Sequence, residues 1–473
     1  MSLSTPTRIE RDSLGELEVP AAAYYGIQTA RAVQNFPISG WGPFPELVTA
    51  TVQIKKAAAI SNSMLGALDP RIAGAIEAAA DEVLGGSLKN QFVVDPFQAG
   101  AGTSHNMNVN EVLANRAAEL LGGQKGAYDI VHPNDHVNMA QSTNDVFPTA
   151  IRLAALELAD SLVQELDGLS RSLGKKAAEF DGIVKSGRTH LQDAVPIRLG
   201  QEFGAYASSV GSNSRRVATA AVELAEVGLG GTAVGTGLNA PAGYRELVVN
   251  ELSRIARRRL RPADNYFEAM QSMGPLAALS GALKTAAVDI VRIANDIRLL
   301  SSGPNTGLSE IKLPAVQPGS SIMPGKVNPV MAEMTAMVCF QVIGNDSTIT
   351  LAAQAGQLEL NVMMPVIAFD LLMSLRILKN GVRAFRERLV EGITADHERC
   401  RWFVEHSTAL VTALNPRLGY DRAAEIAKRA IAAGKTIREV MVDFSLLPAD
   451  EIASLMDTRA MTESPDTPLP RKD

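Results

Sequence analysis

The sequence predicts a mainly α-helical protein built around a central, elongated bundle of five helices. Of its 473 residues, 46% are apolar but only 5% are aromatic, and sheets draw more heavily than helices on aromatic and β-branched residues. Similar long amphipathic patterns cover residues 200–227, 268–301, 330–352 and 357–391. In a fifth stretch, leucines recur at helical spacing for about six turns: Leu153, Leu156, Leu162, Leu166, Leu169 and Leu173.

The length suggests about three domains, at a prior of about 150 residues per domain. We expect a mixed, mostly helical N-terminal domain over residues 1–143, the long-helix bundle over 144–395 and a small helical C-terminal domain over 396–473. The first boundary follows a change from polar segments to the long leucine pattern. The second follows a shortening of the helical pattern, which Asn415-Pro416 interrupts.

Within the first domain, Gly and Pro recur over residues 1–45, which we therefore expect to be irregular. Helical patterns follow over 45–64 and 70–84. An amide-rich polar stretch comes next. The helix after it is expected to begin near Glu111 and to end at the glycine pair Gly122-Gly123.

Several classes of protein are excluded by composition. The net charge of −6 and the pI of about 5.7 argue against a nucleic-acid surface. Cys339 and Cys400 are the only cysteines, too few for a disulfide framework or a cysteine metal cluster. The most apolar long segment, residues 362–378, contains Asp370 and Arg376 and cannot be an ordinary membrane span. The N-terminal segment is too charged for a signal peptide, so we expect a cytoplasmic protein.

A loop between two helical regions concentrates unusual residues: Gly319-Ser320-Ser321-Ile322-Met323-Pro324-Gly325-Lys326-Val327-Asn328-Pro329. Its prolines restrict the backbone and its glycines permit torsions that other residues resist. Ordered loops of this kind often hold reactive groups. The simpler interpretation, a helix-to-helix turn with a solvated lysine, remains open from these residues alone.

Three further segments carry hydroxyls and amides with little charge: Gly102–Asn106, Gln141–Asn144 and Gly187–Asp193. Together with the loop they offer neutral hydrogen-bond donors and a few cations. Carboxylates only accept hydrogen bonds, and N–H or cationic donors bind them most strongly. The combination suits a small dicarboxylate substrate.

The loop resembles the signature loop of the aspartase/fumarase superfamily. Three more segments are similar to segments of that family, namely Gly187–Ala194, His132–Asp135 and Gly344–Asp346, and the likeness extends from Arg8 to about Thr458. The resemblance implies elimination across a carbon–carbon bond of a four-carbon acid, with release of fumarate. The reaction would pass through a dianionic aci-carboxylate, which preorganised donors must stabilise.

By the same resemblance, Ser320 is the base that removes the proton, and Lys326 and Asn328 hold the carboxylate that gains charge. Ser321 assists through its hydroxyl or amide. A serine is a poor base at its ordinary pKa, so its alkoxide would need stabilising amides and cations. The resemblance thus implies Ser320, Lys326 and His190 as the catalytic residues, and we predict them as such.

The remaining predicted site residues match the family's substrate-contacting segments. They are Thr103, Ser104, Ser142, Thr143, Asn144 and Thr189, with Ser321 and Asn328 from the loop. Other interpretations stay open: His190 as a helix-capping or core histidine, and Thr103 and Ser104 as simple helix caps. His132 and His136 lie four residues apart, but the lack of further ligands argues against a metal. The family associates residues 132–135 with a peripheral anion site.

The leaving group divides the family. Ammonia can leave an α-ammonium without an acid, whereas hydroxide needs one. Gly102–Ser104 and Gln141–Asn144 favour ammonia from L-aspartate, while Asn110–Ala117 and Leu414–Ala424 would fit an enzyme that removes water from malate. We predict L-aspartate, with malate as the alternative. A non-catalytic structural helical protein is a remote third interpretation, against which the retained site residues argue.

The resemblance also implies a homotetramer in which central helices pair and each site takes residues from three subunits. Long helices with extensive apolar faces need such partners. It implies no organic cofactor, with a divalent cation as an activator at most. Neither nucleic acid nor membrane is expected as a partner.

Overall fold

The computed structural model describes residues 6–463. Contacts divide the chain into two compact units. Unit 1 comprises the chain up to Val163, Arg215–Ala287 and Phe340–Lys379, and unit 2 comprises Gln164–Ser214, Val288–Cys339 and the chain from Asn380 onward. The expected domain boundaries at residues 143 and 395 stay predictions.

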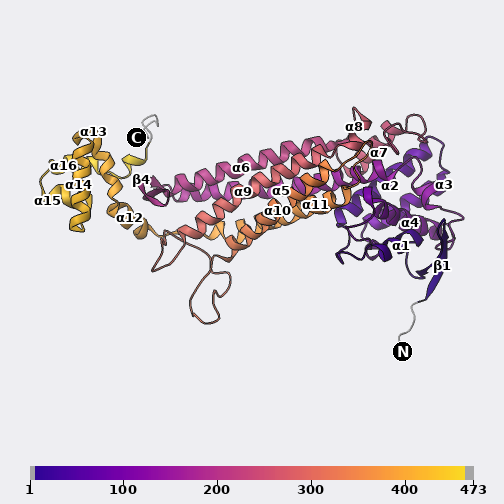
Figure 1. Cartoon of the computed structure of the whole chain (residues 1–473), viewed down its shortest axis with the longest axis horizontal. Coiled ribbons are helices and arrows are strands. Elements are labelled where there is room, and N and C mark those ends of the chain that lie inside the picture. Colours follow the sequence, from indigo (N-terminus) through magenta and orange to yellow (C-terminus); the bar gives the residue numbers. More distant parts are fainter. Residues whose placement is uncertain (1–5, 464–473) are drawn as a thin grey trace. The chain divides into compact units, whose positions relative to one another are not determined.

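The five expected long helices are present and form the longest ribbons in Figure 1. They are α5 (Thr143–Glu179), α6 (Leu199–Val222), α9 (Gly274–Leu300), α10 (Val330–Gln354) and α11 (Met364–Arg388). Each unit contains a part of every one of them. The prediction of a mainly α protein built on a long-helix bundle is confirmed. None of the helices within residues 6–463 combines the length and apolarity needed to cross a membrane.

Two predicted helix starts are wrong for local reasons. The pattern over 268–301 is split, because Pro275 fits only the first turn of α9 and the chain before it is extended at Ser272. The pattern from 357 begins as a helix only at Met364. There the Asn361 amide donates to the carbonyls of Ala352 and Ala353, both at 3.0 Å, and turns the chain.

The remaining elements of unit 1 precede or interrupt the bundle helices. They are β1 (Thr7–Asp12), β2 (Gly15–Pro20), α1 (Ile27–Asn35), α2 (Pro45–Met64), α3 (Pro70–Leu84), α4 (Thr103–Leu120), β5 (Glu226–Val227), α7 (Tyr244–Ala256), β6 (Arg261–Pro262) and α8 (Tyr266–Gln271). Helices α2 and α3 each begin with a proline, which suits a first turn whose N–H groups have no helical partner. Apolar side chains of α2, α3 and α4 form one core.

Residues 6–45, the described part of the segment expected to be irregular, are more regular than expected. Strands β1 and β2 form an antiparallel hairpin, and α1 follows. The first backbone N–H groups of α1 donate hydrogen bonds to carboxylates that are distant in the sequence. Glu111 accepts from Gly26, Gln28 and Thr29, while Glu10 accepts from Ile27. Because these carboxylates lie far along the chain or on another element, local sequence gave no sign of the helix.

The remaining elements of unit 2 are short. They are β3 (Val184–Thr189), β4 (Gln192–Arg198), β7 (Ile311–Lys312), β8 (Thr394–Ala395), α12 (His397–His406), α13 (Asn415–Leu418), α14 (Tyr420–Ala433), α15 (Ile437–Asp443) and α16 (Ala449–Leu455). Strands β3 and β4 form an antiparallel hairpin, whereas β7 pairs antiparallel with β8, which follows only after α10 and α11 in the chain. A capping box of Thr436 and Glu439 starts α15. Buried apolar residues from α12 to α16 form a separate small core.

Candidate active site

The Ser320 loop belongs to unit 2 and connects β7 to α10. It is closed on itself. The Gly319 amide donates to the Lys326 carbonyl at 2.8 Å, and the Asn328 side-chain amide donates to the Gly319 carbonyl at 2.6 Å. A Cβ on Gly319 would lie 2.3 Å from the Lys326 oxygen, so a side chain cannot be accommodated there. The loop therefore has a defined shape, as its glycines and prolines predict.

Two backbone amides point at the Ser320 hydroxyl. Its Oγ accepts hydrogen bonds from Ile322 N at 3.2 Å and from Met323 N at 3.0 Å. Donors in this position stabilise negative charge on the oxygen and make it easier for the hydroxyl to lose its proton. This arrangement is what a serine base requires. It also exists in simple serine turns, so it supports the assignment without deciding it.

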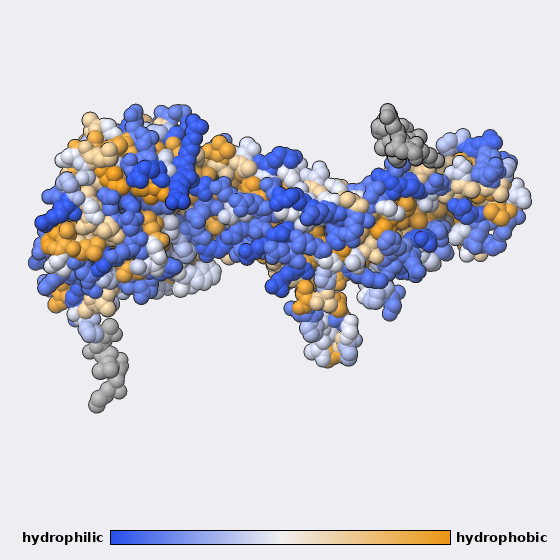
Figure 2. Space-filling model, turned by 180° about the vertical axis from the view of Figure 1, so that it is seen from behind, coloured by the Kyte–Doolittle hydropathy of each residue, from blue (hydrophilic) through white to orange (hydrophobic). Residues whose placement is uncertain are grey.

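A hollow of about 520 Å³ is lined by residues 315–320 and 323–327, which include Ser320 and Lys326. Figure 2 shows hydrophobic groups on this long loop, where Ile322 is 82% exposed. Among the residues that the structure describes, the Lys326 ammonium has no hydrogen-bond or ion-pair partner. A cation and a polarised hydroxyl that line the same hollow suit a carboxylate ligand.

The β3–β4 hairpin, also in unit 2, carries Thr189 and His190 at its tip. His190 and Leu191 both have positive φ, 56° and 59°, the pattern of the tight two-residue hairpin turn. His190 is exposed. It is therefore neither a helix cap nor a core histidine, and those alternatives are wrong. Within residues 6–463, no hydrogen bond joins this tip to the Ser320 loop.

In unit 1, Thr103 and Ser104 open helix α4. The preceding residue, Gly102, has φ +82°, and a Cβ there would lie 2.5 Å from the Phe147 ring, so glycine is required. Gly102 occupies the cap position, so the capping interpretation of Thr103 and Ser104 is wrong. One amide of the first turn, His105 N, is already bound to the Gln98 side chain at 2.8 Å.

Helix α5 begins with Thr143 and Asn144, directly after Ser142. The Asn106 side-chain amide donates to Thr143 Oγ1 at 2.9 Å, which ties the start of α5 to the first turn of α4. The Asn144 side-chain amide donates to the Ala233 carbonyl at 2.8 Å. The structure therefore brings two of the predicted binding segments together, through a residue that the sequence analysis did not single out.

The amide-rich stretch before Glu111 was expected to lie outside the helix, but α4 already begins at Thr103. Its side-chain amides can be buried within a helix because they form hydrogen bonds with residues on other segments. Asn108 donates to the Gln91 carbonyl at 3.0 Å, and Asn106 donates to Thr143 and, at 3.3 Å, to Asn138 Oδ1. The prediction failed because those partners are distant in sequence.

Lys55 lies beneath these segments and was missed as well. Its Nζ donates to Asn138 Oδ1 at 2.8 Å and to Gln141 Oε1 at 2.9 Å. The side chain is fully buried, and burial lowers its pKa to about 7, against a smaller opposing effect of Asp145. A lysine inside an apolar helical stretch was the only sequence signal, and it did not indicate which groups the ammonium would reach.

Asp145 is the buried carboxylate of the same region. It accepts hydrogen bonds from the amides of Ser142 at 2.8 Å, Gly230 at 2.9 Å and Thr232 at 3.0 Å. Burial raises its pKa to about 6, although the three amides and Lys55 act the other way. Asp145 thus fixes the turn that presents Ser142 and Thr143.

The His132–Asp135 segment forms a turn of π-helix. His132 Nδ1 accepts from the amides of Asn134 at 3.2 Å and Asp135 at 3.1 Å, so this ring nitrogen carries a lone pair. His136 Nδ1 in turn accepts from the His132 amide at 2.9 Å, and burial lowers the pKa of His136. In the described part of the chain, no group of three or more potential ligands could hold a metal ion.

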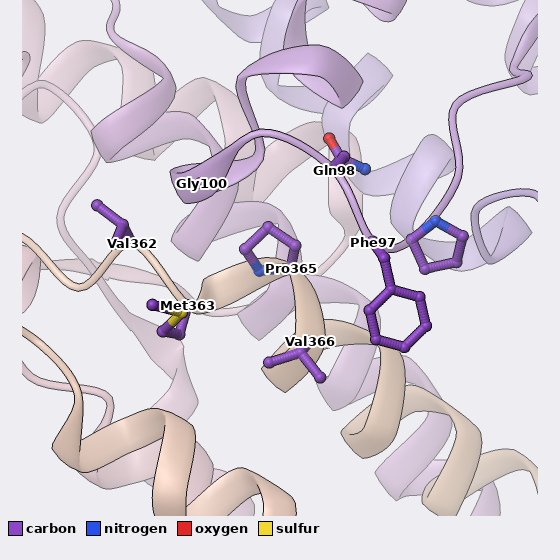
Figure 3. A pocket seen from close by; sticks show the side chains of 8 residues that line it. Phe97, Gln98, Gly100, Val362, Met363, Pro365 and Val366 are labelled. Carbon is purple, nitrogen blue, oxygen red and sulfur yellow. The ribbon is translucent and has the colours of Figure 1, made fainter. Parts of the chain in front are cut away.

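A second cavity, which lies in unit 1 and has a volume of about 630 Å³, is found between residues 96–100 and 362–366. Figure 3 shows mostly apolar side chains around it, with the Gln98 amide pointing away from Phe97 and Val366. That amide is already engaged: Gln98 Oε1 accepts from His105 N at 2.8 Å, and Nε2 donates to the Asp95 carbonyl at 2.9 Å. Despite its size, this cavity does not suit a dicarboxylate.

Comparison with known proteins shows the family of this chain. A family described as lyase matches residues 15–344. The chain belongs to this lyase family. A second family, described as the C-terminus of fumarase C, matches residues 410–463, the part of the chain that contains α13 to α16.

Aspartate ammonia-lyases from Bacillus sp. and Pseudomonas aeruginosa are 49% and 51% identical to this lyase. Those alignments cover 97% and 96% of this chain, and 98% and 97% of the relatives. A class II fumarate hydratase from Thermosynechococcus vestitus is 48% identical over 95% of this chain and 96% of its own length. Both branches of the family are thus represented.

Solved structures of the family match along nearly the whole chain. A fumarate lyase:delta crystallin from Brucella melitensis bound to cobalt is 50% identical, with a TM-score of 0.94 over 97% of this chain and all of that one (100%). A class II fumarase from Schistosoma mansoni is 40% identical, with a TM-score of 0.93 over 97% and 99%. The long-helix fold of this lyase is that of its family.

Proposed function

We propose that this lyase reversibly eliminates ammonia from L-aspartate to give fumarate. The observation that carries the proposal is the Ser320 hydroxyl: its Oγ accepts hydrogen bonds from two backbone amides, and Ser320 lines the same hollow as Lys326, whose ammonium has no partner among residues 6–463. Full-length relatives named aspartate ammonia-lyase, at 49–52% identity, support the choice of substrate.

The first step is proton abstraction. Ser320 Oγ takes a proton from the carbon next to the substrate's β-carboxylate, and the electron pair moves into that carboxylate to give the aci-carboxylate. The Ile322 and Met323 amides lower the cost of forming the alkoxide. The carboxylate that becomes doubly charged faces Lys326 and Asn328, whose second side-chain N–H remains available because one is bound to Gly319.

The second step breaks the carbon–nitrogen bond. The electron pair returns from the aci-carboxylate to form the double bond of fumarate, and ammonia leaves with the pair of the broken bond. The serine proton then passes to solvent or to ammonia. The remaining polar groups of the substrate would be held by the other predicted site residues: Thr103, Ser104, Ser142, Thr143, Asn144, Thr189, His190 and Ser321. Ammonia needs no acid to leave, so His190, which we predicted to be catalytic, would act by binding a substrate carboxylate and not by donating a proton.

Removal of water from malate is the second candidate, supported by the class II fumarate hydratase at 48% identity. The two are separated by ultraviolet detection of fumarate with L-aspartate in one reaction and L-malate in the other. We expect fumarate from L-aspartate, and a clear preference for malate would overturn the choice of leaving group. A protein inactive on both would favour the structural alternative.

We also propose that the enzyme works as a homotetramer in the cytoplasm, with each site shared between three subunits. Exposed apolar side chains on α10, including Phe340 at 59% and Leu351 at 62%, offer surface for such contacts. Light scattering tests this, and a monodisperse monomer at micromolar concentration would contradict it. The reaction should need no organic cofactor, and activity should survive removal of divalent cations by a chelator.

A further inference from the structure

Glu310 is a completely buried carboxylate in unit 2, one residue before β7. Its Oε1 lies 2.9 Å from Arg188 Nη1, and its Oε2 lies 3.0 Å from Lys185 Nζ. Both cations belong to strand β3. Lys185 also reaches Glu202, whose side chain is partly exposed, at 3.1 Å, so two carboxylates balance two cations. A buried charge cluster of this kind is stable only when every member is paired.

The backbone of Glu310 is fixed as firmly as its side chain. Its amide donates to the Leu300 carbonyl at 2.9 Å, and its carbonyl accepts from Asp396 N at the same distance. The Arg188 guanidinium lies 4.9 Å from the centre of the Phe403 ring on α12. The position of Arg188 is therefore set by one anchored carboxylate and one aromatic face.

The tip of the hairpin needs such an anchor. Arg188 directly precedes Thr189 and His190, and a β-bulge lies between Ser186 and Arg188. Two-stranded hairpins are only marginally stable alone in water, and positive φ at a residue such as His190 costs further free energy. Bulges also increase local twist. Contacts within the two strands are thus insufficient to hold the tip in one place.

We propose that Glu310 is a positioning residue of the active site: it holds Arg188 and so sets the place of Thr189 and His190. The inference rests on the proposed function of that hairpin in substrate binding. Glu310 itself does not touch substrate, because it is buried with both oxygens directed at cations. Its effect passes through Arg188 to the tip.

The principal test is Arg188→Lys, which keeps the charge but loses the planar fork and the stacking surface. We expect kcat/KM for L-aspartate to fall about 10- to 100-fold, mostly through KM, as for a displaced binding group. Hydrogen exchange measured by mass spectrometry should become faster over residues 188–192. The matched control is Glu165→Gln, which removes the part-buried ion pair with Arg386 elsewhere in unit 2 and should leave both quantities unchanged.

A double-mutant cycle with Glu310→Gln tests whether the two residues act as one unit. In the Glu310→Gln background, Arg188→Lys should change kcat/KM by less than about twofold, because the contact is already lost. If Glu310→Gln does not fold, the single Arg188→Lys variant and its exchange pattern still decide. Additive effects, or Arg188→Lys values within about twofold of wild type with unchanged exchange, would overturn the proposal.

Failure of this proposal can be distinguished from failure of the proposed function. If the wild-type enzyme releases fumarate from malate instead, the same cycle is run with malate. If it turns over neither substrate, the proposed function fails. Faster exchange confined to residues 188–192 in Arg188→Lys would then still support Glu310 as the anchor of the hairpin, and unchanged exchange would refute it.

Discussion

The polar segments of unit 1 and the Ser320 loop of unit 2 hold their functional groups in opposite ways. In unit 1, Thr143 and Gln141 are bonded to buried side chains, including the fully buried Lys55. In the loop, the hydrogen bonds of Ser320 and Asn328 stay within the loop, and much of its surface is exposed. The first region is held by partners on other segments of unit 1, whereas the loop is held by hydrogen bonds of its own.

The largest expected effect distinguishes the Ser320 hydroxyl, which takes the proton, from the Thr143 hydroxyl, which belongs to a binding segment. Ser320→Ala should lower kcat about 10³- to 10⁴-fold, since the base is lost, with helical content by circular dichroism unchanged. Thr143→Val, which removes the acceptor for Asn106, should cost only about tenfold in kcat/KM. Turnover of Ser320→Ala within about tenfold of wild type, a barrier change of about 1.4 kcal/mol, would refute the base assignment.

Two lysine variants, one in unit 1 and one in the Ser320 loop, test the comparison between these regions directly. Lys55→Met leaves Asn138 and Gln141 without their donor and Asp145 without its nearby cation, so unfolding by urea should be easier by about 3–4 kcal/mol. Lys326→Met should leave stability within about 0.5 kcal/mol, since the ammonium is exposed, yet it should abolish substrate binding. Equal destabilisation by both variants would mean that the loop is as firmly built as unit 1.

Two glycines with the same φ of +82° give a finer test. Gly102→Ala meets the Phe147 ring at 2.5 Å and should destabilise by about 2–3 kcal/mol. Gly325→Ala has nothing within 4 Å and should cost about 1 kcal/mol from backbone strain alone. Thermal unfolding of both variants measures the difference, and similar losses would contradict the tight packing assigned to unit 1.

What the sequence could predict depended on how local the cause was. Leucine spacing along α5 and the glycines and prolines of the Ser320 loop act within a few residues, so fold class and loop were predictable. Lys55 reaches Asn138 and Gln141, which are 83 and 86 positions away, and Arg188 reaches Glu310 at a separation of 122. Partners at such distances are set by tertiary structure, and the sequence pattern contained no signal for them.

The smallest expected effect is a pH dependence confined to unit 1. The pKa of Lys55 falls on folding from 10.5 to about 7, so above pH 7 the unfolded chain binds a proton that the folded chain has released. Stability relative to Lys55→Met should therefore rise with pH, by up to about 1 kcal/mol between pH 7 and pH 8. Urea unfolding at fixed protein concentration measures this, and a difference that shrinks with rising pH would contradict a buried, easily neutralised lysine.

For Asp145 we expect the opposite pH dependence of stability. Its pKa rises on folding from 3.8 to about 6, so the stability that it contributes below pH 3.8 is lost as pH rises to 6. Relative to Asp145→Asn, the wild type should become less stable across that window. The same urea series, extended to acid, reports it, and a wild type that gains stability over this range would show that Asp145 ionises freely.

The most direct test of the central claim is a crystal structure of the Ser320→Ala variant soaked with L-aspartate. We predict that one substrate carboxylate lies against Lys326 and Asn328, with the carbon that loses its proton facing residue 320. A ligand bound instead in the apolar cavity between Phe97 and Val366, or anywhere remote from Lys326, would contradict the account.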